Sequence, residues 1–361
     1  MHPTEDSADT GAHPPRLDPL DAVDLHLHTL ASDGAWTPEA LLDHLASNGF
    51  RVAAVCDHDT QRSVPAAMRL GGERGIAVIP GVEVTTRWAD RQWHLLVYGI
   101  DPNRSDAAAA PFQSVLAEQD ATLQGLAEDA RQRLEASGRA LPSLEAIVEG
   151  RPMWPFHVLS ASIKDGHAKG LKEAAELVTQ LGGGFSADVP LGRVVAAAHE
   201  AGGLCIIAHP GRSDSVGVMT EADLDAMLAE IPIDGLEAHY RSYTDAQTAL
   251  YRDLAAARGL LVSCGSDSHA PQQPVDPRPW RAAWCASLLE RLGVRVNPLP
   301  DGEAAWIAGM DPLAVVPAPP DTEGTTGDGL AADGQAEPAG EQIMEAQAEI
   351  APESASAPAG S

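Results

Sequence analysis

Short apolar runs alternate along this chain with segments in which apolar residues recur at helical spacing. The runs predict seven β-strands, at residues 22–27, 52–56, 77–79, 95–98, 204–208, 235–238 and 260–264. Helical spacing follows several of them, at residues 38–49, 191–202 and 244–258. In the first of these helices Leu41, Leu42 and Leu45 share one face, and Thr37 is expected to cap its N-terminus. Strands that alternate with helices are typical of a mostly parallel α/β sheet or barrel.

Residues 103–189 break this alternation. They carry helical patterns, at 114–137 and 171–181, and no clear strand. Predicted strands precede and follow this stretch. We therefore predict a helical insertion, or cap, within a barrel that is built from residues 21–102 and 190–312.

The two ends of the chain differ in composition from its body. Residues 1–20 contain several Pro and Asp without periodicity, and residues 313–361 are rich in Pro, Ala, Gly and Glu. Both are predicted to be disordered, because such segments bury too little apolar surface to fold. No charged segment followed by an apolar stretch opens the chain, and no apolar run approaches the roughly 18 residues of a membrane span. We therefore expect a cytoplasmic protein that does not contact membranes.

The chain of 361 residues has a formal net charge of −28. Nine acidic residues and no Lys or Arg lie in residues 315–361, and the first 20 residues contribute −3, which leaves −16 for the body. A body this acidic repels a nucleic-acid backbone, so we expect no long nucleic acid as a partner. Any phosphate group must be attracted locally, which bound divalent metal ions would do.

Histidines and carboxylates gather where the predicted strands end, as catalytic groups do in α/β barrels. His26 and His28 close the first strand. Because positions i and i+2 face the same side of a strand, both imidazoles can reach one metal ion. The other candidates are Asp33, His58 between Asp57 and Asp59, Glu83, His94, His209, Asp267 and His269. Each motif alone is weak evidence, but the set exceeds the four ligands of one zinc ion and predicts two or three ions that share bridging carboxylates.

In their order along the chain, these motifs resemble those of the PHP (polymerase and histidinol phosphatase) superfamily. The matching segments are His26-Leu-His28-Thr with Ser-Asp33-Gly, Asp57-His58-Asp59, Gly81-Val-Glu83, Ala208-His209-Pro210-Gly and Gly265-Ser-Asp267-Ser-His269. The resemblance covers residues 22–295. It is strongest to the branch of the 3′,5′-nucleoside bisphosphate phosphatases and ribonuclease AM, which also has Asp rather than His after the histidine pair. It implies a distorted seven-stranded β/α barrel with a trinuclear site that holds manganese, zinc or iron.

The resemblance also implies the metal ligands. They are His26, His28, Asp33, His58, Glu83, His94, His209, Asp267 and His269. Asp57 and Asp59 are expected to orient His58, and the alternative for both is a solvated loop. A metal-bound water, acidified to a pKa of about 7, would be the nucleophile, so that no Ser or Cys nucleophile is required. The same ions would stabilise the charge that develops on the phosphoryl oxygens.

Two arginines are candidates for contact with substrate. Arg212 follows His209 by three residues and is therefore expected near the mouth of the barrel. Arg151 lies in the predicted insertion, where the resembling branch commonly reads Arg-x-His. In this chain the histidine is displaced to His157. Trp154 and Phe156 lie between the two and are expected either to stack on a base or to pack in the core of the insertion.

A third candidate is His239, which follows a predicted strand and is a possible proton donor. Taken together, the residues predict a phosphoric-ester hydrolase, most simply a phosphomonoesterase that acts on nucleoside 3′,5′-bisphosphates and that also degrades short RNA from the 5′ end. A first alternative is a histidinol-phosphate phosphatase, which shares the metal ions but not the nucleobase. A second is a non-catalytic metal-binding accessory module of DNA replication or repair, against which stand the complete ligand set and the absence of a polymerase segment.

Overall fold

All seven runs predicted as strands form strands of one sheet in the computed structural model, which describes residues 16–212, 218–310, 312 and 313. They are β2 (Ala22–Leu27), β3 (Phe50–Val55), β4 (Ala77–Trp88), β5 (Arg91–Tyr98), β7 (Leu204–Ile207), β8 (Gly235–Tyr240) and β9 (Leu261–Gly265). Two short strands extend the sheet, since β6 (Val189–Pro190) pairs with β4 and β10 (Trp280–Arg281) pairs with β2. Both were too short to be predicted from the pattern of apolar residues.

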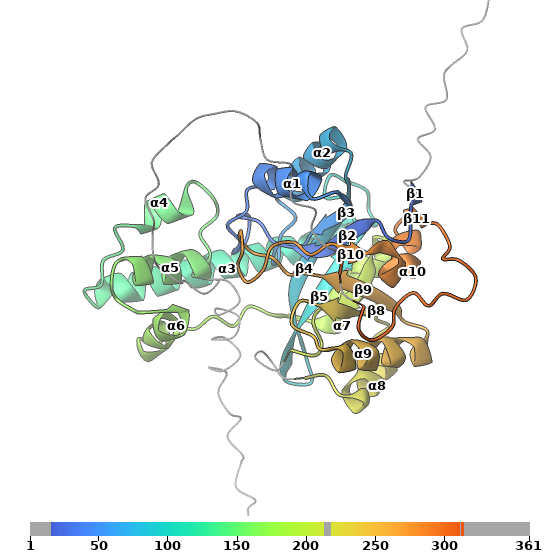
Figure 1. Cartoon of the computed structure of the whole chain (residues 1–361). Helices are drawn as coiled ribbons and strands as arrows, with labels where there is room; N and C mark the ends of the chain where they lie inside the picture. The colour runs from blue at the N-terminus through green and yellow to red at the C-terminus, as the bar shows by residue number, and fades with distance from the viewer. Residues whose placement is uncertain (1–15, 213–217, 311, 314–361) are drawn as a thin grey trace, which may run out of the picture.

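The sheet curves into a nearly closed barrel (Figure 1). Strands β2, β3 and β4 are parallel, β5 is antiparallel to β4 and to β7, and β7, β8 and β9 are again parallel. Beyond the last strand, Leu27 forms a bridge with Ser268, and the Asp267 amide donates to the His26 carbonyl at 2.8 Å. These contacts bring the ends of β9 and β2 together, and the predicted distorted β/α barrel is confirmed.

Helices cover the outside of the barrel (Figure 1). They are α1 (Pro38–Ser47), α2 (Val64–Arg74), α7 (Leu191–Glu200), α8 (Glu221–Glu230), α9 (Asp245–Arg258), the 3₁₀ helix η1 (Ala282–Cys285) and α10 (Ala286–Arg291). As expected, Thr37 caps α1, where its hydroxyl accepts a hydrogen bond from the Ala40 amide at 3.1 Å. The apolar face of α1 is fully buried at Leu41, Leu42 and Leu45. The helical spacing of the apolar residues therefore predicted correctly which face of α1 is buried.

The stretch between β5 and β6 is helical, and its far part projects to one side of the barrel (Figure 1). It comprises α3 (Ala110–Ala136), α4 (Leu144–Val148), α5 (Pro155–Lys164) and α6 (Leu171–Gln180). The first half of α3 packs on the barrel through Phe112 and Val115. Its second half packs with α5 and α6 around a separate apolar cluster that contains Leu134, Val158 and Val178. The sequence pattern predicted α3 and α6 but missed α4, which is one turn long, and α5.

The described residues begin with a short strand, β1 (Arg16–Leu17), which pairs with β11 (Arg295–Val296) beside α10. The described residues therefore include the last part of the segment from residue 1 to residue 20. The remainder of the predicted disordered arm and nearly all of the acidic tail lie outside the described residues. Within the part that the structure describes, none of the helices is long and apolar enough to cross a bilayer.

Candidate metal centre

The nine predicted ligands meet at one end of the barrel. They lie in β2 and just after it (His26, His28, Asp33), after β3 (His58), in β4 and β5 (Glu83, His94), after β7 (His209) and after β9 (Asp267, His269). Parallel strands bring their carboxyl ends to the same edge of a sheet, which explains why segments so distant in the sequence converge here. His58 and Glu83 are also joined directly by an isolated β-bridge between β3 and β4.

The backbone is strained at several of these strand ends. Asp59, His209 and Asp267 have positive φ values, of 53°, 28° and 55°. For residues other than glycine this conformation costs about 1–3 kcal/mol each, and it persists only where the surrounding structure imposes it. Three strand ends of the cluster, those of β3, β7 and β9, therefore carry a residue in this conformation, which is consistent with a functional site.

Four ligand atoms form a compact group at the centre of the cluster. His26 Nε2 lies 3.1 Å from His28 Nε2 and 3.1 Å from Glu83 Oε2, and it lies 3.3 Å from Asp267 Oδ1. His28 Nε2 lies 3.2 Å from the same Glu83 oxygen and 3.0 Å from the same Asp267 oxygen. Ligands that surround zinc tetrahedrally at about 2.0–2.1 Å are separated by roughly 3.3 Å. The four atoms thus fit one metal ion.

The Glu83 carboxylate joins this group to a second one. Its other oxygen, Oε1, lies 3.0 Å from His94 Nδ1 and 3.0 Å from His209 Nε2. One carboxylate with imidazoles at both of its oxygens has the arrangement of a ligand that bridges two metal ions. The Glu83 side chain is 1% exposed, so bulk water does not solvate this carboxylate.

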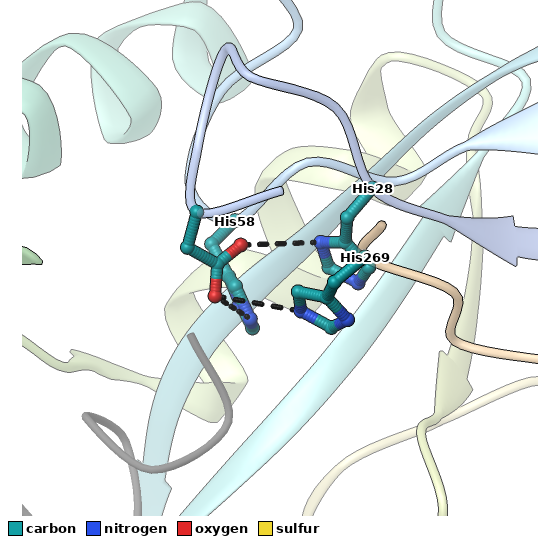
Figure 2. A group of neighbouring side chains, drawn as sticks. His28, His58 and His269 are labelled. Atoms are coloured by element: carbon teal, nitrogen blue, oxygen red, sulfur yellow. Dashed lines mark ion pairs between the residues drawn. The ribbon is translucent and has the colours of Figure 1, made fainter. Parts of the chain in front are cut away.

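A third group surrounds Asp33 in the loop after β2. Figure 2 shows His28, His58 and His269 turned toward one carboxylate. The Asp33 oxygens lie 3.7 Å from His28 Nδ1, 3.7 Å from His58 Nε2 and 3.4 Å from His269 Nε2. The three groups form one continuous cluster. His28 lies beside both the first and the third group, and His58 lies beside both the second and the third.

Buried nitrogen atoms in this cluster lack hydrogen-bond partners. Among the described residues they include His28 Nδ1, His58 Nδ1, His94 Nδ1 and His269 Nε2. A buried polar atom without a partner costs about 1–3 kcal/mol, and native proteins rarely tolerate several at one place. A bound cation would accept these lone pairs, so the residues present fit a metal site.

The protonation states of the cluster also suit a cation. Burial alone would raise the pKa of the Glu83 carboxyl, but His26 and His58 hold it well below its ordinary value. Burial lowers the pKa of His58 to about 4 and that of His209 to about 3, so both imidazoles are neutral near pH 7. Despite burial, Asp267 and Glu83 raise the pKa of His28 to about 10, so its imidazole carries an extra proton that a metal ion would have to displace.

Glu237 braces two of the candidate ligands, His26 and His209, and was missed in the sequence. Its Oε1 lies 3.0 Å from His26 Nδ1, and its Oε2 accepts a hydrogen bond from the His209 amide at 2.7 Å. It fixes the ring of His26 so that Nε2 faces the cluster. The signal for it was present, since Glu237 is the only charged residue of β8 and is fully buried. A carboxylate that is buried in an apolar strand needs a hydrogen-bond or charged partner to offset its desolvation.

Glutamine in place of Glu237 is expected to weaken metal binding by about 10–100-fold, the usual effect of losing an outer partner of a metal-bound histidine. Competition for Mn²⁺ between the protein and a chelating dye measures this effect. Glu230→Gln is the matched control, because Glu230 bonds Trp88 Nε1 on the surface, outside the cluster. Equal metal affinities of the Glu237 variant and the native chain would contradict the bracing role.

Asp57 and Asp59 do not hydrogen bond to His58, contrary to expectation. Asp57 accepts from the amide and hydroxyl of Thr29, at 2.7 and 2.8 Å, and from Ser32. Asp59 accepts from the amide and hydroxyl of Thr85, at 2.9 and 2.8 Å. Both carboxylates are buried, so the solvated-loop alternative is wrong as well. They hold the loop that carries Asp33 and the strand that carries Glu83.

Of the two candidate arginines, Arg212 lies beside the cluster and Arg151 contacts a neighbouring loop. Arg212 is 7% exposed, and its Nη1 lies 4.0 Å from Asp267 Oδ2. Arg151 donates hydrogen bonds to the carbonyls of Leu30, Val148 and Ile147. Leu30 belongs to the loop between His28 and Asp33, so Arg151 links the helical insertion to a ligand-bearing loop.

His239 lies outside the cluster. Its ring stacks on Trp284 at 4.5 Å, and its Nε2 lies 2.8 Å from Arg252 Nη1. The alignment of β8 with β9 shifts between Glu237 and His239, which turns the histidine toward η1 and α9. Its position gives no support to the expected role in proton transfer.

The aromatic residues of the insertion are packing residues. Trp154 is 5% exposed, packs with Leu123 and donates through Nε1 to Asp120 at 2.8 Å. Phe156 packs against the apolar cluster of the insertion, and His157 Nδ1 accepts from the Trp154 amide at the start of α5. For Trp154 the structure therefore supports core packing rather than stacking on a base.

Known proteins are similar in sequence to about two thirds of this chain. The chain is 30% identical over 270 residues to a 3′,5′-nucleoside bisphosphate phosphatase of Chromobacterium violaceum, across 69% of this chain and 87% of the relative. It is also 30% identical over 260 residues to a 5′-3′ exoribonuclease of Haemophilus influenzae, across 69% of this chain and 90% of the relative. No family model matches the chain.

Among solved structures, a Bifidobacterium adolescentis protein described as a metal-dependent phosphoesterase aligns with a TM-score of 0.62 at 24% identity. The match covers 77% of this chain and 98% of that protein. It supports the barrel fold independently of the sequence relatives. The chain therefore belongs to the PHP superfamily and is a hydrolase of phosphoric esters.

Proposed function

We propose that the cluster binds two or three divalent ions, manganese, zinc or iron, and that the protein removes phosphate from nucleoside 3′,5′-bisphosphates. The observation that carries the proposal is the Glu83 carboxylate, which has imidazoles close to both of its oxygens. A single structural ion needs no shared ligand, whereas phosphoester hydrolases commonly use neighbouring ions. The relatives named above, a bisphosphate phosphatase and an exoribonuclease, support a nucleotide substrate.

Three sets of residues would hold these ions. They are His26, His28, Glu83 and Asp267 in the first set, Glu83, His94 and His209 in the second, and Asp33, His58 and His269 in the third. Bound divalent ions would supply an acidified water as the nucleophile and positive charge for the phosphoryl oxygens.

The protein's own groups bring the phosphate to this place. The chain carries a net charge of −28, so the protein as a whole repels a phosphorylated substrate. Arg212 supplies positive charge beside Asp267 and is proposed to bind a phosphate oxygen. Arg151 is proposed to act from the insertion side, where it is joined to Leu30. Burial of the cluster excludes bulk water and strengthens these charge interactions.

The two alternative functions are less well supported. Both relatives named above are hydrolases of nucleotide or RNA phosphoesters, and neither is a histidinol-phosphate phosphatase or a replication module. All nine candidate residues also lie together in one cluster, which an inert module would not require. We therefore propose 5′-3′ hydrolysis of short RNA as a second activity of the same site, supported by the exoribonuclease relative.

With Mn²⁺ present, the protein is expected to release phosphate from adenosine 3′,5′-bisphosphate. Its kcat/KM should exceed that for histidinol phosphate by about 10–100-fold, because a second charged group gives further charge-assisted hydrogen bonds. Phosphate release under identical conditions measures both substrates. The control is His26→Ala, which removes a central ligand. Release no faster than with this variant would overturn the proposal, and a preference for histidinol phosphate would favour the first alternative.

A further inference from the structure

The two oxygens of the Asp267 carboxylate have different surroundings. Oδ1 faces the cluster, 3.0 Å from His28 Nε2 and 3.3 Å from His26 Nε2. Oδ2 faces away from these imidazoles and accepts hydrogen bonds from the Tyr240 hydroxyl at 2.8 Å and from Arg241 Nη1 at 2.6 Å. One oxygen is therefore presented to the metal site, and the other is held by the protein.

Arg241 also holds the backbone of the turn that carries Asp267. Its Nη1 lies 3.0 Å from the Asp267 carbonyl and 3.2 Å from the Ser266 carbonyl. The guanidinium lies over the ring of Tyr240, 4.6 Å from its centroid, and the side chain is 8% exposed. A buried cation with several acceptors on one turn restricts that turn more than a surface ion pair does.

The turn needs such support, because Asp267 has a φ of +55°, in the left-handed region. His269 follows two residues later, and its Nδ1 lies 3.0 Å from the Asp267 carbonyl that Arg241 also contacts. The Arg241 guanidinium therefore helps to position two proposed ligands, Asp267 and His269.

The topology explains how these residues meet. Strands β8 and β9 are parallel neighbours, and Tyr240 is paired with Gly265 at their ends. Residues that follow β8 therefore lie beside residues that follow β9. Tyr240 and Arg241 come at the end of β8, and Ser266 and Asp267 come directly after β9.

We propose that Tyr240 and Arg241 are positioning residues, which hold the turn after β9 and present Asp267 to the metal site through Oδ1. This inference rests on the proposed metal-dependent function. A carboxylate oxygen that already accepts a phenolic and a guanidinium hydrogen bond is a poor second ligand, so Asp267 binds through one oxygen. Outer partners of this kind orient a ligand before the metal arrives.

The test uses Mn²⁺ alone and the full chain, with metal affinity measured by competition against a chelating dye. Arg241→Met is expected to weaken the binding of at least one ion by about 10–100-fold, and Tyr240→Phe by about 10-fold. Arg241→Lys keeps the charge but reaches fewer acceptors, so it should restore part of the affinity. The matched control is Arg252→Gln, because Arg252 is also partly buried but bonds Trp284 O at 3.1 Å, away from the cluster.

Each outcome tests either the proposed function or the positioning role of Tyr240 and Arg241. If the native chain binds no Mn²⁺ and releases no phosphate, the proposed function fails. If it binds Mn²⁺ and Arg241→Met binds it equally well, the positioning role is overturned while the function stands. An unchanged metal affinity with a raised KM would also overturn it, because Arg241 would then contact the substrate. Weaker binding by Arg252→Gln as well would show a loss of folding rather than of positioning.

Discussion

Replacing Glu83 by glutamine is expected to lower kcat/KM for phosphoester hydrolysis by about 10³-fold or more, which is the scale of losing several kcal/mol of metal-derived stabilisation. Glutamine has the same shape but no negative charge. Its amide nitrogen cannot bind a cation, so one of the two groups that Glu83 joins would lose its shared ligand. Steady-state phosphate release gives the rate, and elemental analysis gives the number of ions that remain.

The control for this variant is Thr86→Val, three residues further along β4. Thr86 is fully buried and bonds the Trp93 carbonyl at 2.7 Å, so its replacement disturbs the same strand without touching the cluster. This control should lower thermal stability and leave the metal content unchanged. Native activity in Glu83→Gln would mean that Glu83 is not a bridging ligand. Loss of metal in both variants would mean that the effect comes from disturbance of β4 and not from the loss of the carboxylate.

Removal of the metal ions by a chelator is expected to abolish activity and to lower the melting temperature by roughly 10 °C. Ligand present at about a thousand times its Kd stabilises a folded protein by about 4 kcal/mol, and each kcal/mol corresponds to a few degrees in a protein of this size. In the metal-free protein, buried imidazoles and carboxylates lose the cation that pairs them. Calorimetry with and without the chelator measures the shift.

Addition of Mn²⁺, Zn²⁺ or Fe²⁺ one at a time should restore both quantities, and the ion that restores the most activity identifies the best cofactor. Circular dichroism of the metal-free protein should retain its secondary structure, because the apolar core around β2, β3 and β9 does not include the ligands. Full activity after dialysis against the chelator would contradict metal dependence at this cluster.

Much of the barrel was predictable because the information is local. Runs such as 52–56 and 204–208 are apolar throughout, as buried strands must be, and they became β3 and β7. The short strands β6 and β10 were not predictable, because two residues carry no periodicity. The helices α4 and α5 were missed for related reasons, since α4 is five residues long and α5 begins at Pro155 within an aromatic segment.

His239 shows how a small irregularity changes the function assigned to a residue. Alternation along a strand would put Glu237 and His239 on the same side. The register shift between them separates the two, so that Glu237 reaches His26 while His239 packs on Trp284. Such a shift depends on the pairing of β8 with β9, and it cannot be predicted from the residues of β8 alone.

By itself, the sequence determined the class of fold, the class of reaction and the nine candidate ligands, because strand patterns are local and most of the candidates lie beside the end of a predicted strand. Only the tertiary structure decided which candidate ligand atoms lie together and that Glu83 lies between two groups of imidazoles. It also decided that Glu237 contacts His26 and that Tyr240 and Arg241 contact Asp267. The reason is distance along the chain. Glu237 lies 211 residues from His26, and contacts of that range arise only when the strands have paired.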